Sequence, residues 1–119
     1  MTKRNNNRAR GSGYEDAASS FMMSNGFEIL DRNWMAGHKE IDLIARKDDL
    51  IVFVEVKSSR NDSFGHPAER VDFRKQQNLI IAAETYIMEK EITGHDIRFD
   101  LITFLNGKLE YYPGAFQAE

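Results

Sequence analysis

The segment EIDLIARKDDLIVFVEVK, residues 40–57, contains two apolar runs separated by the acidic pair Asp48-Asp49. Both runs are rich in Ile, Val, Leu and Phe and have the length of a strand. A two-residue polar break between two such runs is typical of a β-hairpin, although Asp-Asp is a weaker turn signal than Asn-Gly. The segment therefore predicts two antiparallel strands. The acids inside them need an explanation, because a buried carboxylate is costly unless something pairs with it.

The turn decides which residues of the two strands lie opposite each other. We take Lys47 to face Leu50 across the turn. Counting outward then places Asp42 opposite Glu55, and opposed residues share one face of the sheet. The charged side chains expected on that face are Glu40, Asp42, Glu55 and Lys57. The side chains expected on the other face are Val52, Val54 and Val56. A slip of one residue would separate the two acids.

Two carboxylates that face each other on neighbouring strands repel unless a cation lies between them. Oxygen ligands of this kind suit Mg²⁺ or Mn²⁺, and an ion that keeps several waters can deliver one as a nucleophile. Lys57 lies two residues beyond Glu55 on the same face, where its ammonium group could orient that water and stabilise charge on a phosphate. The pattern of Asp42, Glu55 and Lys57 thus indicates metal-dependent phosphodiester hydrolysis.

A structural explanation of the same residues stays open. An acid, any residue and a lysine in succession occur about once by chance in a chain of this length. Glu55 and Lys57 could instead lie on a solvated strand face, with a weak ion pair between Lys57 and Glu40.

The remaining sequence predicts one run of helices and strands. Helical spacing of apolar residues follows Gly13 and ends at Asn25-Gly26, and Asn106-Gly107 is a strong hairpin signal. The elements expected beside the hairpin are a helix before residue 25, a strand at 27–34, a helix at 68–90 with an apolar face at Leu79, Ala82, Ala83, Tyr86 and Ile87, and two strands around Asn106-Gly107. The order helix, three strands, helix, two strands favours an α/β fold, a mixed sheet with flanking helices.

Length and composition limit the protein class. The chain has 119 residues, of which 41% are hydrophobic and 29% charged, and it contains no cysteine. These values predict one globular domain without thiolate metal sites, and the absence of a long apolar run predicts a cytoplasmic protein without a membrane segment. Residues 1–10 contain four basic residues and no acid, so we expect a disordered basic arm at 1–10 and a single domain at 11–119.

The combined pattern resembles the PD-(D/E)xK or restriction-endonuclease-like nuclease superfamily, and most closely its YraN-like family of small bacterial proteins. Archaeal Holliday-junction resolvases are similar in the same regions. The residues that carry the resemblance are Glu15, Ala17 and Ala18, residues 26–33, 40–45, 52–57 and 64–69, Lys75, and Arg98-Phe99-Asp100. The Pro that names the superfamily is Ile41 here, and many relatives have Gly in place of Lys39.

The resemblance implies a role for each site residue. Asp42 and Glu55 would bind the metal together with the backbone carbonyl of Val56, and Lys57 would be the catalytic lysine. Glu15 would supply a further catalytic acid from the first helix. Lys75 would approach from the second helix and contact a substrate phosphate.

Glu15 and Lys75 also have ordinary structural explanations. Ser12 and Glu15 fit a capping box at the start of a helix. Lys75 precedes Leu79 by one turn, so its stem could simply cover the core while its charge stays in water.

The sequence therefore predicts a Mg²⁺- or Mn²⁺-dependent endonuclease that acts on DNA, with branched or junction DNA as the analogous substrate. One alternative is a catalytically silent nucleic-acid-binding or adaptor module that keeps the fold. Another is a protein-binding scaffold on which the acids are surface charge. RNA as substrate and a homodimeric state stay open.

Overall fold

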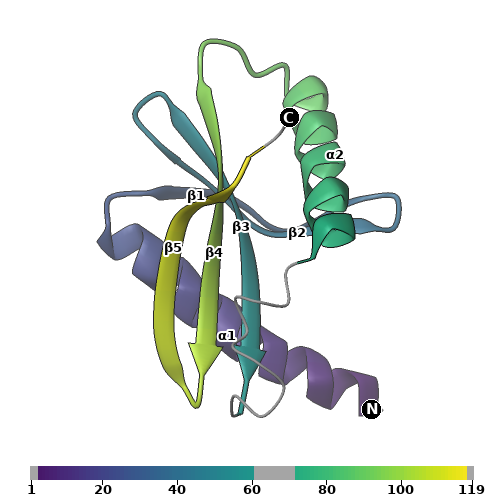
Figure 1. Cartoon of the computed structure of the whole chain (residues 1–119), viewed down its shortest axis with the longest axis vertical. Coiled ribbons are helices and arrows are strands. Elements are labelled where there is room, and N and C mark those ends of the chain that lie inside the picture. The colour runs from purple at the N-terminus through teal and green to yellow at the C-terminus, as the bar shows by residue number, and fades with distance from the viewer. Residues whose placement is uncertain (1–2, 61–71, 118–119) are drawn as a thin grey trace.

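A computed structural model describes the backbone of residues 3–60 and 72–117 and the side chains of residues 13–60 and 72–117. The elements are α1 (Lys3–Ser24), β1 (Glu28–Ala36), β2 (Lys39–Lys47), β3 (Leu50–Ser59), α2 (Phe73–Glu89), β4 (Asp96–Leu105) and β5 (Lys108–Phe116) (Figure 1). Their order and the α/β class are those that the sequence predicts. No helix in the described part of the chain is long and apolar enough to cross a membrane.

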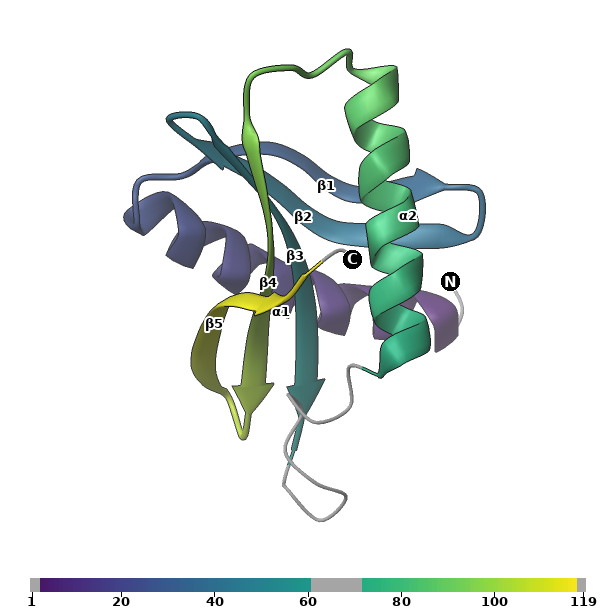
Figure 2. The same ribbon diagram turned by 45° about the horizontal axis from the view of Figure 1, so that its top comes forward.

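The five strands form one mixed sheet in the order β1-β2-β3-β4-β5. Neighbouring strands are antiparallel except for β3 and β4, which are parallel. A parallel pair needs a crossover connection, and α2 lies within it. The two helices cover opposite faces of the sheet, with α1 behind it and α2 in front of it in Figures 1 and 2.

Each helix encloses a separate apolar core against the sheet. The core under α2 includes Ile44, Phe53, Leu79, Ala83, Tyr86 and Phe99. The core under α1 includes Ala18, Met22, Leu43, Val52, Val54 and Ile102. Alternate residues of β3 point to opposite faces of the sheet, as the strand period requires. Phe53 therefore faces α2, as does Glu55 two residues on, and Val52 and Val54 face α1.

Glycine and local hydrogen bonds fix the ends of the helices. After α1, Gly26 has φ of 89° and its N–H donates to Met23 O, while Phe27 N–H donates to Met22 O. This Schellman arrangement ends α1 where Asn25-Gly26 predicts. At the start of α2, Asp72 is the N-cap and its carboxylate accepts a hydrogen bond of 2.9 Å from Lys75 N. The sequence predicts a continuous helix from residue 68, and this is wrong at Asp72, which is extended and directly precedes the helix. Residues 68–71 lie outside the described part.

The start of α1 differs from the sequence-based expectation. The helix begins at Lys3 and so includes most of the segment for which we expect a disordered arm. Because Ser12 lies in the interior of this helix, the capping box of Ser12 and Glu15 is wrong: an N-cap must stand at the first turn. The division of the chain into an arm and a domain stays a prediction.

Candidate metal centre

The hairpin formed by β2 and β3 has the predicted register. Lys47 pairs with Leu50 across the turn, and the pairing continues to Leu43 and Val54. Asp48, the first turn residue, has φ of 54°, as a tight hairpin turn requires. The next position outward brings Asp42 and Glu55 together on the face that α2 covers.

Strand β2 is irregular at Asp42. Ile41 packs in the core under α2 and Leu43 in the core under α1, although residues two apart on a regular strand share a face. Beyond this point, Val56 N–H donates a hydrogen bond of 2.8 Å to Asp42 Oδ2. The Asp42 carboxylate thus accepts a backbone hydrogen bond where the described pairing of the two strands ends, and this bond orients the carboxylate beside Glu55.

Glu55 is the central side chain of the site. Its side chain is only 3% exposed, and its Oε2 lies 3.4 Å from Lys75 Nζ and 3.6 Å from Lys57 Nζ. Its Oε1 is buried and has no hydrogen-bond partner in the described structure. A buried carboxylate oxygen without a donor carries a desolvation cost, so this oxygen marks a place where a cation or a proton would be stabilised.

The pKa of Asp42 reflects the same crowding. Burial and the negative charge of Glu55 raise this pKa to about 8, although the hydrogen bond from Val56 N–H lowers it and Glu40 adds a smaller upward contribution. A hydrogen bond between the carboxyl groups of Asp42 and Glu55 also raises the pKa, and it exists only while one of them carries a proton. In metal-free protein at pH 7 Asp42 therefore carries a proton.

The residues present fit a divalent cation. Replacing the proton of Asp42 by a cation would let both carboxylates be charged without repulsion and give Glu55 Oε1 a partner. Among the described residues, no group of three or more His, Cys, Asp or Glu side chains could hold a metal ion. A cation would thus have two carboxylate ligands, a number that suits Mg²⁺ because this ion keeps several of its waters.

Lys57 and Lys75 approach the carboxylates from different elements. Lys57 extends from β3 and Lys75 from the first turn of α2, and both ammonium groups reach the same oxygen of Glu55. Both side chains are about one-third exposed, so their charges border solvent. The structure places the Lys75 ammonium group beside Glu55, which is the position that the resemblance implies. Its contact with a substrate phosphate stays a prediction.

Glu15 is half-buried on α1, which packs on the other face of the sheet. No hydrogen bond or ion pair between described residues joins Glu15 to Asp42 or Glu55. Its role as a further catalytic acid stays a prediction, as does the Val56 carbonyl as a metal ligand.

The site face continues across two more strands, which the sequence did not predict. The register of β3 and β4 places Thr103 beside Lys57, and β5 pairs Glu110 with Thr103. Tyr112 Oη donates a hydrogen bond of 3.0 Å to Glu110 Oε1. The sequence does not indicate that Lys57, Thr103 and Glu110 lie side by side, because the register of a parallel pair depends on a long crossover rather than on a turn.

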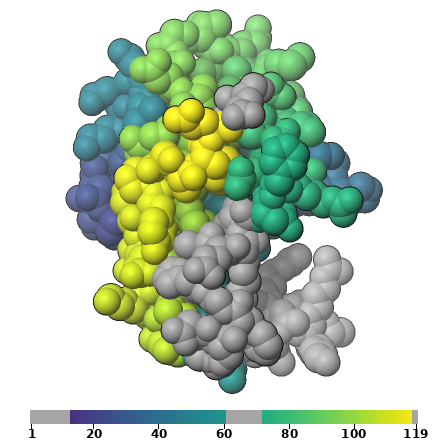
Figure 3. Space-filling model, viewed as in Figure 1, coloured from purple at the N-terminus to yellow at the C-terminus, as the bar shows by residue number. Residues whose placement is uncertain are grey.

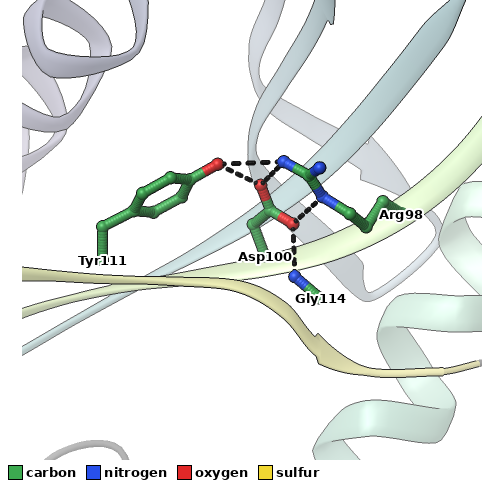
Figure 4. A network of polar contacts seen from close by, with 4 residues as sticks. All are labelled: Arg98, Asp100, Tyr111 and Gly114. Atoms are coloured by element: carbon green, nitrogen blue, oxygen red, sulfur yellow. Dashed lines mark hydrogen bonds and ion pairs between the residues drawn. The ribbon is translucent and has the colours of Figure 1, made fainter. Parts of the chain in front are cut away.

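A second buried carboxylate, Asp100 on β4, has a different environment (Figure 4). It is fully buried and accepts hydrogen bonds from Arg98 Nε at 2.8 Å, Arg98 Nη2 at 2.9 Å and Gly114 N at 2.9 Å, and a further one from Tyr111 Oη. Arg98 also lies within hydrogen-bond distance of Tyr111 Oη, at 3.1 Å. Because its oxygens are all engaged, Asp100 is a structural acid, in contrast to Glu55.

Comparison with known proteins identifies relatives across nearly the whole chain. The model of the uncharacterised protein family UPF0102 matches residues 14–104. A UPF0102 protein of Chloroherpeton thalassium is 46% identical over 101 residues, which cover 85% of this chain and 78% of that protein. A UPF0102 protein of Dictyoglomus turgidum is 42% identical over 117 residues, which cover 93% of this chain and 99% of that protein. The matched range includes Asp42, Glu55, Lys57 and Lys75.

Proposed function

The chain belongs to the uncharacterised protein family UPF0102, the YraN-like family that its motifs indicate, and we propose that it is a metal-dependent endonuclease that hydrolyses phosphodiester bonds in DNA. The observation that carries the proposal is Glu55 Oε1, a buried carboxylate oxygen without a partner, next to an Asp42 whose pKa is raised. Both acids of such a pair can be charged at neutral pH only when a cation lies between them. Two lysines at the same point supply positive charge for a phosphate.

Each side chain has a distinct task in this proposal. Asp42 and Glu55, with the Val56 carbonyl, would hold Mg²⁺ or Mn²⁺, which when bound supplies an activated water and charge for the phosphate. Lys57 orients the attacking water and stabilises the negative charge that develops on the phosphoryl oxygens. Lys75 binds a phosphate of the substrate strand and positions it.

The lysines also explain how the site stays folded before a substrate arrives. In the metal-free protein both ammonium groups lie near Glu55 Oε2 at 3.4 and 3.6 Å. These distances are longer than those of strong charge-assisted hydrogen bonds, so the lysines can move toward a phosphate at a small cost. A metal on Glu55 would weaken the hold of that carboxylate on both lysines.

The contacts of Lys57 and Lys75 with Glu55 also favour a second candidate, a catalytically silent nucleic-acid-binding module. Two lysines and Glu55 form ion pairs that need no metal. In a silent module the lysines would bind phosphate and the acids would only hold the lysines in place. The two candidates differ in cleavage and in the effect of a metal on stability.

A cleavage assay separates the candidates. Labelled linear, flapped and four-way DNA would be incubated with the full chain in Mg²⁺, Mn²⁺ or EDTA. We expect cleavage with either metal, none in EDTA, and a loss of at least about a hundredfold for Asp42→Asn. Asp49→Asn in the exposed β2–β3 turn is the matched control and should cut at the parent rate.

The outcomes assign the function. Cleavage that persists in EDTA contradicts the metal mechanism. DNA binding without cleavage in any metal supports the silent module. A preference for the flapped or four-way substrate would extend the proposal to structure-specific cleavage of branched DNA. Cytoplasmic location stays a prediction from composition.

A further inference from the structure

Large apolar side chains lie on the outer face of α2, the face turned away from the sheet. Phe73 is 72% exposed, Ile81 46% and Met88 77%. Their spacing of eight and seven residues places them on one stripe of the helix, opposite the buried residues Leu79 and Ala83. Figure 3 shows atoms of α2, coloured teal to green, at the molecular surface. Gln77 and Glu84 lie between them on the same face, so the stripe offers three separate apolar contact points.

The stripe is complementary to itself in the antiparallel direction. If two α2 helices pack with a two-fold axis at Ile81, the Ile81 side chains of both copies meet and Phe73 of one copy lies against Met88 of the other. In the same arrangement Arg74 of one copy lies opposite Glu89 of the other. Like the pair of Phe73 and Met88, these two residues are centred in the sequence within one residue of Ile81. A single axis therefore satisfies the apolar contacts and an ion pair together.

The charges of α2 favour this partner further. The helix has no acid in its first turn and no basic residue in its last turn. Arg74 instead lies near the N-terminus and Glu89 at the C-terminus, where each faces the unfavourable end of the helix dipole. An antiparallel partner places Arg74 beside the C-terminal end of the other helix and Glu89 beside its N-terminal end. Both charges then lie at favourable ends.

We propose that the outer face of α2 is the interface of a homodimer in which two α2 helices pack antiparallel about Ile81. A helix of 17 residues is about 25 Å long, so a contact formed by one helix from each copy is small. The dimer dissociates on dilution. Lys75 projects from the opposite side of α2, so the interface leaves both candidate metal centres uncovered and places them at opposite ends of the helix pair.

Sedimentation equilibrium of the full chain over a range of concentrations tests the interface. We expect a concentration-dependent dimer, and we expect Ile81→Glu to be monomeric because it places two like charges against each other at the axis. Met23→Glu is the matched control, since Met23 is 53% exposed on the other helix, and this variant should dimerise as the parent does. Thermal unfolding of each variant shows whether it is folded.

Charge reversal tests the geometry without removing apolar area. Arg74→Glu and Glu89→Arg should each weaken the dimer by at least about tenfold, and the double variant should recover most of the loss because the pair is restored with opposite signs. A parent chain that is monomeric at the highest concentration it tolerates overturns the proposal. So does a dimer that Ile81→Glu leaves intact, or a double variant as weak as the single ones.

Discussion

Asp42→Asn should stabilise the metal-free protein. Burial and the charge of Glu55 raise the pKa of Asp42 from 3.8 to about 8, so at pH 7 the folded chain holds a proton that the unfolded chain has released. Between these pKa values each pH unit costs about 1.4 kcal/mol of stability, which amounts to about 4 kcal/mol at pH 7. Solvent contact at the half-buried Asp42 reduces this to about 2–4 kcal/mol.

The asparagine keeps the local structure and removes the proton requirement. Its amide oxygen can accept the hydrogen bond from Val56 N–H, and its amide nitrogen can donate to the unpartnered Oε1 of Glu55. We therefore expect the variant to exceed the parent by about 2–4 kcal/mol in free energy of unfolding at pH 7 in EDTA.

The difference between variant and parent should depend on pH in a defined way. For an acid whose folded pKa is raised, the contribution to stability is fully present below the unfolded pKa and is lost as the pH rises to the folded pKa. The advantage of Asp42→Asn should thus be smallest below about pH 4, grow by up to about 1.4 kcal/mol per unit toward pH 8 and then level off. Urea unfolding in EDTA between pH 4 and 9 measures it.

Asp100→Asn is the matched control, because Asp100 is a buried carboxylate of the same sheet with donors around both oxygens. Breaking its pair with Arg98 should cost about 3–5 kcal/mol. Mg²⁺ should stabilise the parent and not Asp42→Asn. An Asp42→Asn variant that is less stable than the parent at pH 7, or a difference that is flat with pH, would refute the reasoning and make Asp42 a structural partner of Val56.

Three further predictions concern the same site. Lys57→Ala should lower turnover by roughly 10²–10⁴ with the fold and the Mn²⁺ affinity retained, as single-turnover cleavage and calorimetry would measure, and cutting at the parent rate would remove Lys57 from the mechanism. Lys75→Ala should weaken DNA binding and lower the slope of log K against log salt by about 1, whereas an unchanged slope in a salt titration would exclude a phosphate contact. Mg²⁺ binding should release a proton and weaken up to about tenfold for each pH unit below 8, because Asp42 must lose its proton to bind the metal. Calorimetry in buffers of different ionisation enthalpy measures the proton release and the affinity. An affinity that does not change between pH 6 and pH 8 would contradict the raised pKa of Asp42.

The part of the site that lies in the β2–β3 hairpin could be predicted from the sequence. A two-residue turn fixes the register of the strands beside it, so the pairing of Lys47 with Leu50 is enough to bring Asp42 to Glu55. The irregularity at Asp42 was not predicted. It depends on packing, since Ile41 and Leu43 enter different cores, and nothing in the local pattern of alternating residues indicates it.

Contacts between distant segments were harder to predict. The approach of Lys75 to Glu55 came from the resemblance, because helical spacing gives the face of a residue on α2 and not the position of α2 over the sheet. The bonds of Asp100 with Tyr111 and Gly114 cross a shift in the pairing of β4 and β5, which no turn signal encodes. The sequence does not indicate the early start of α1, because Gly11 and Gly13 disfavour a helix.

The bonds of Asp100 also restrict how the length of the chain can vary. Phe99 pairs with Phe116 and Leu101 with Tyr112, so residues 113–115 of β5 all face the single residue Asp100. Gly114, at φ of 62°, directs its N–H to that carboxylate. An insertion or deletion within 112–116 would withdraw this donor from a fully buried acid. Residues added at the exposed turn 106–107 would leave both Gly114 and Asp100 in place. Relatives that retain Asp100 should therefore differ in length at the β4–β5 turn and not at residues 113–115. An internal tag should be inserted at 106–107.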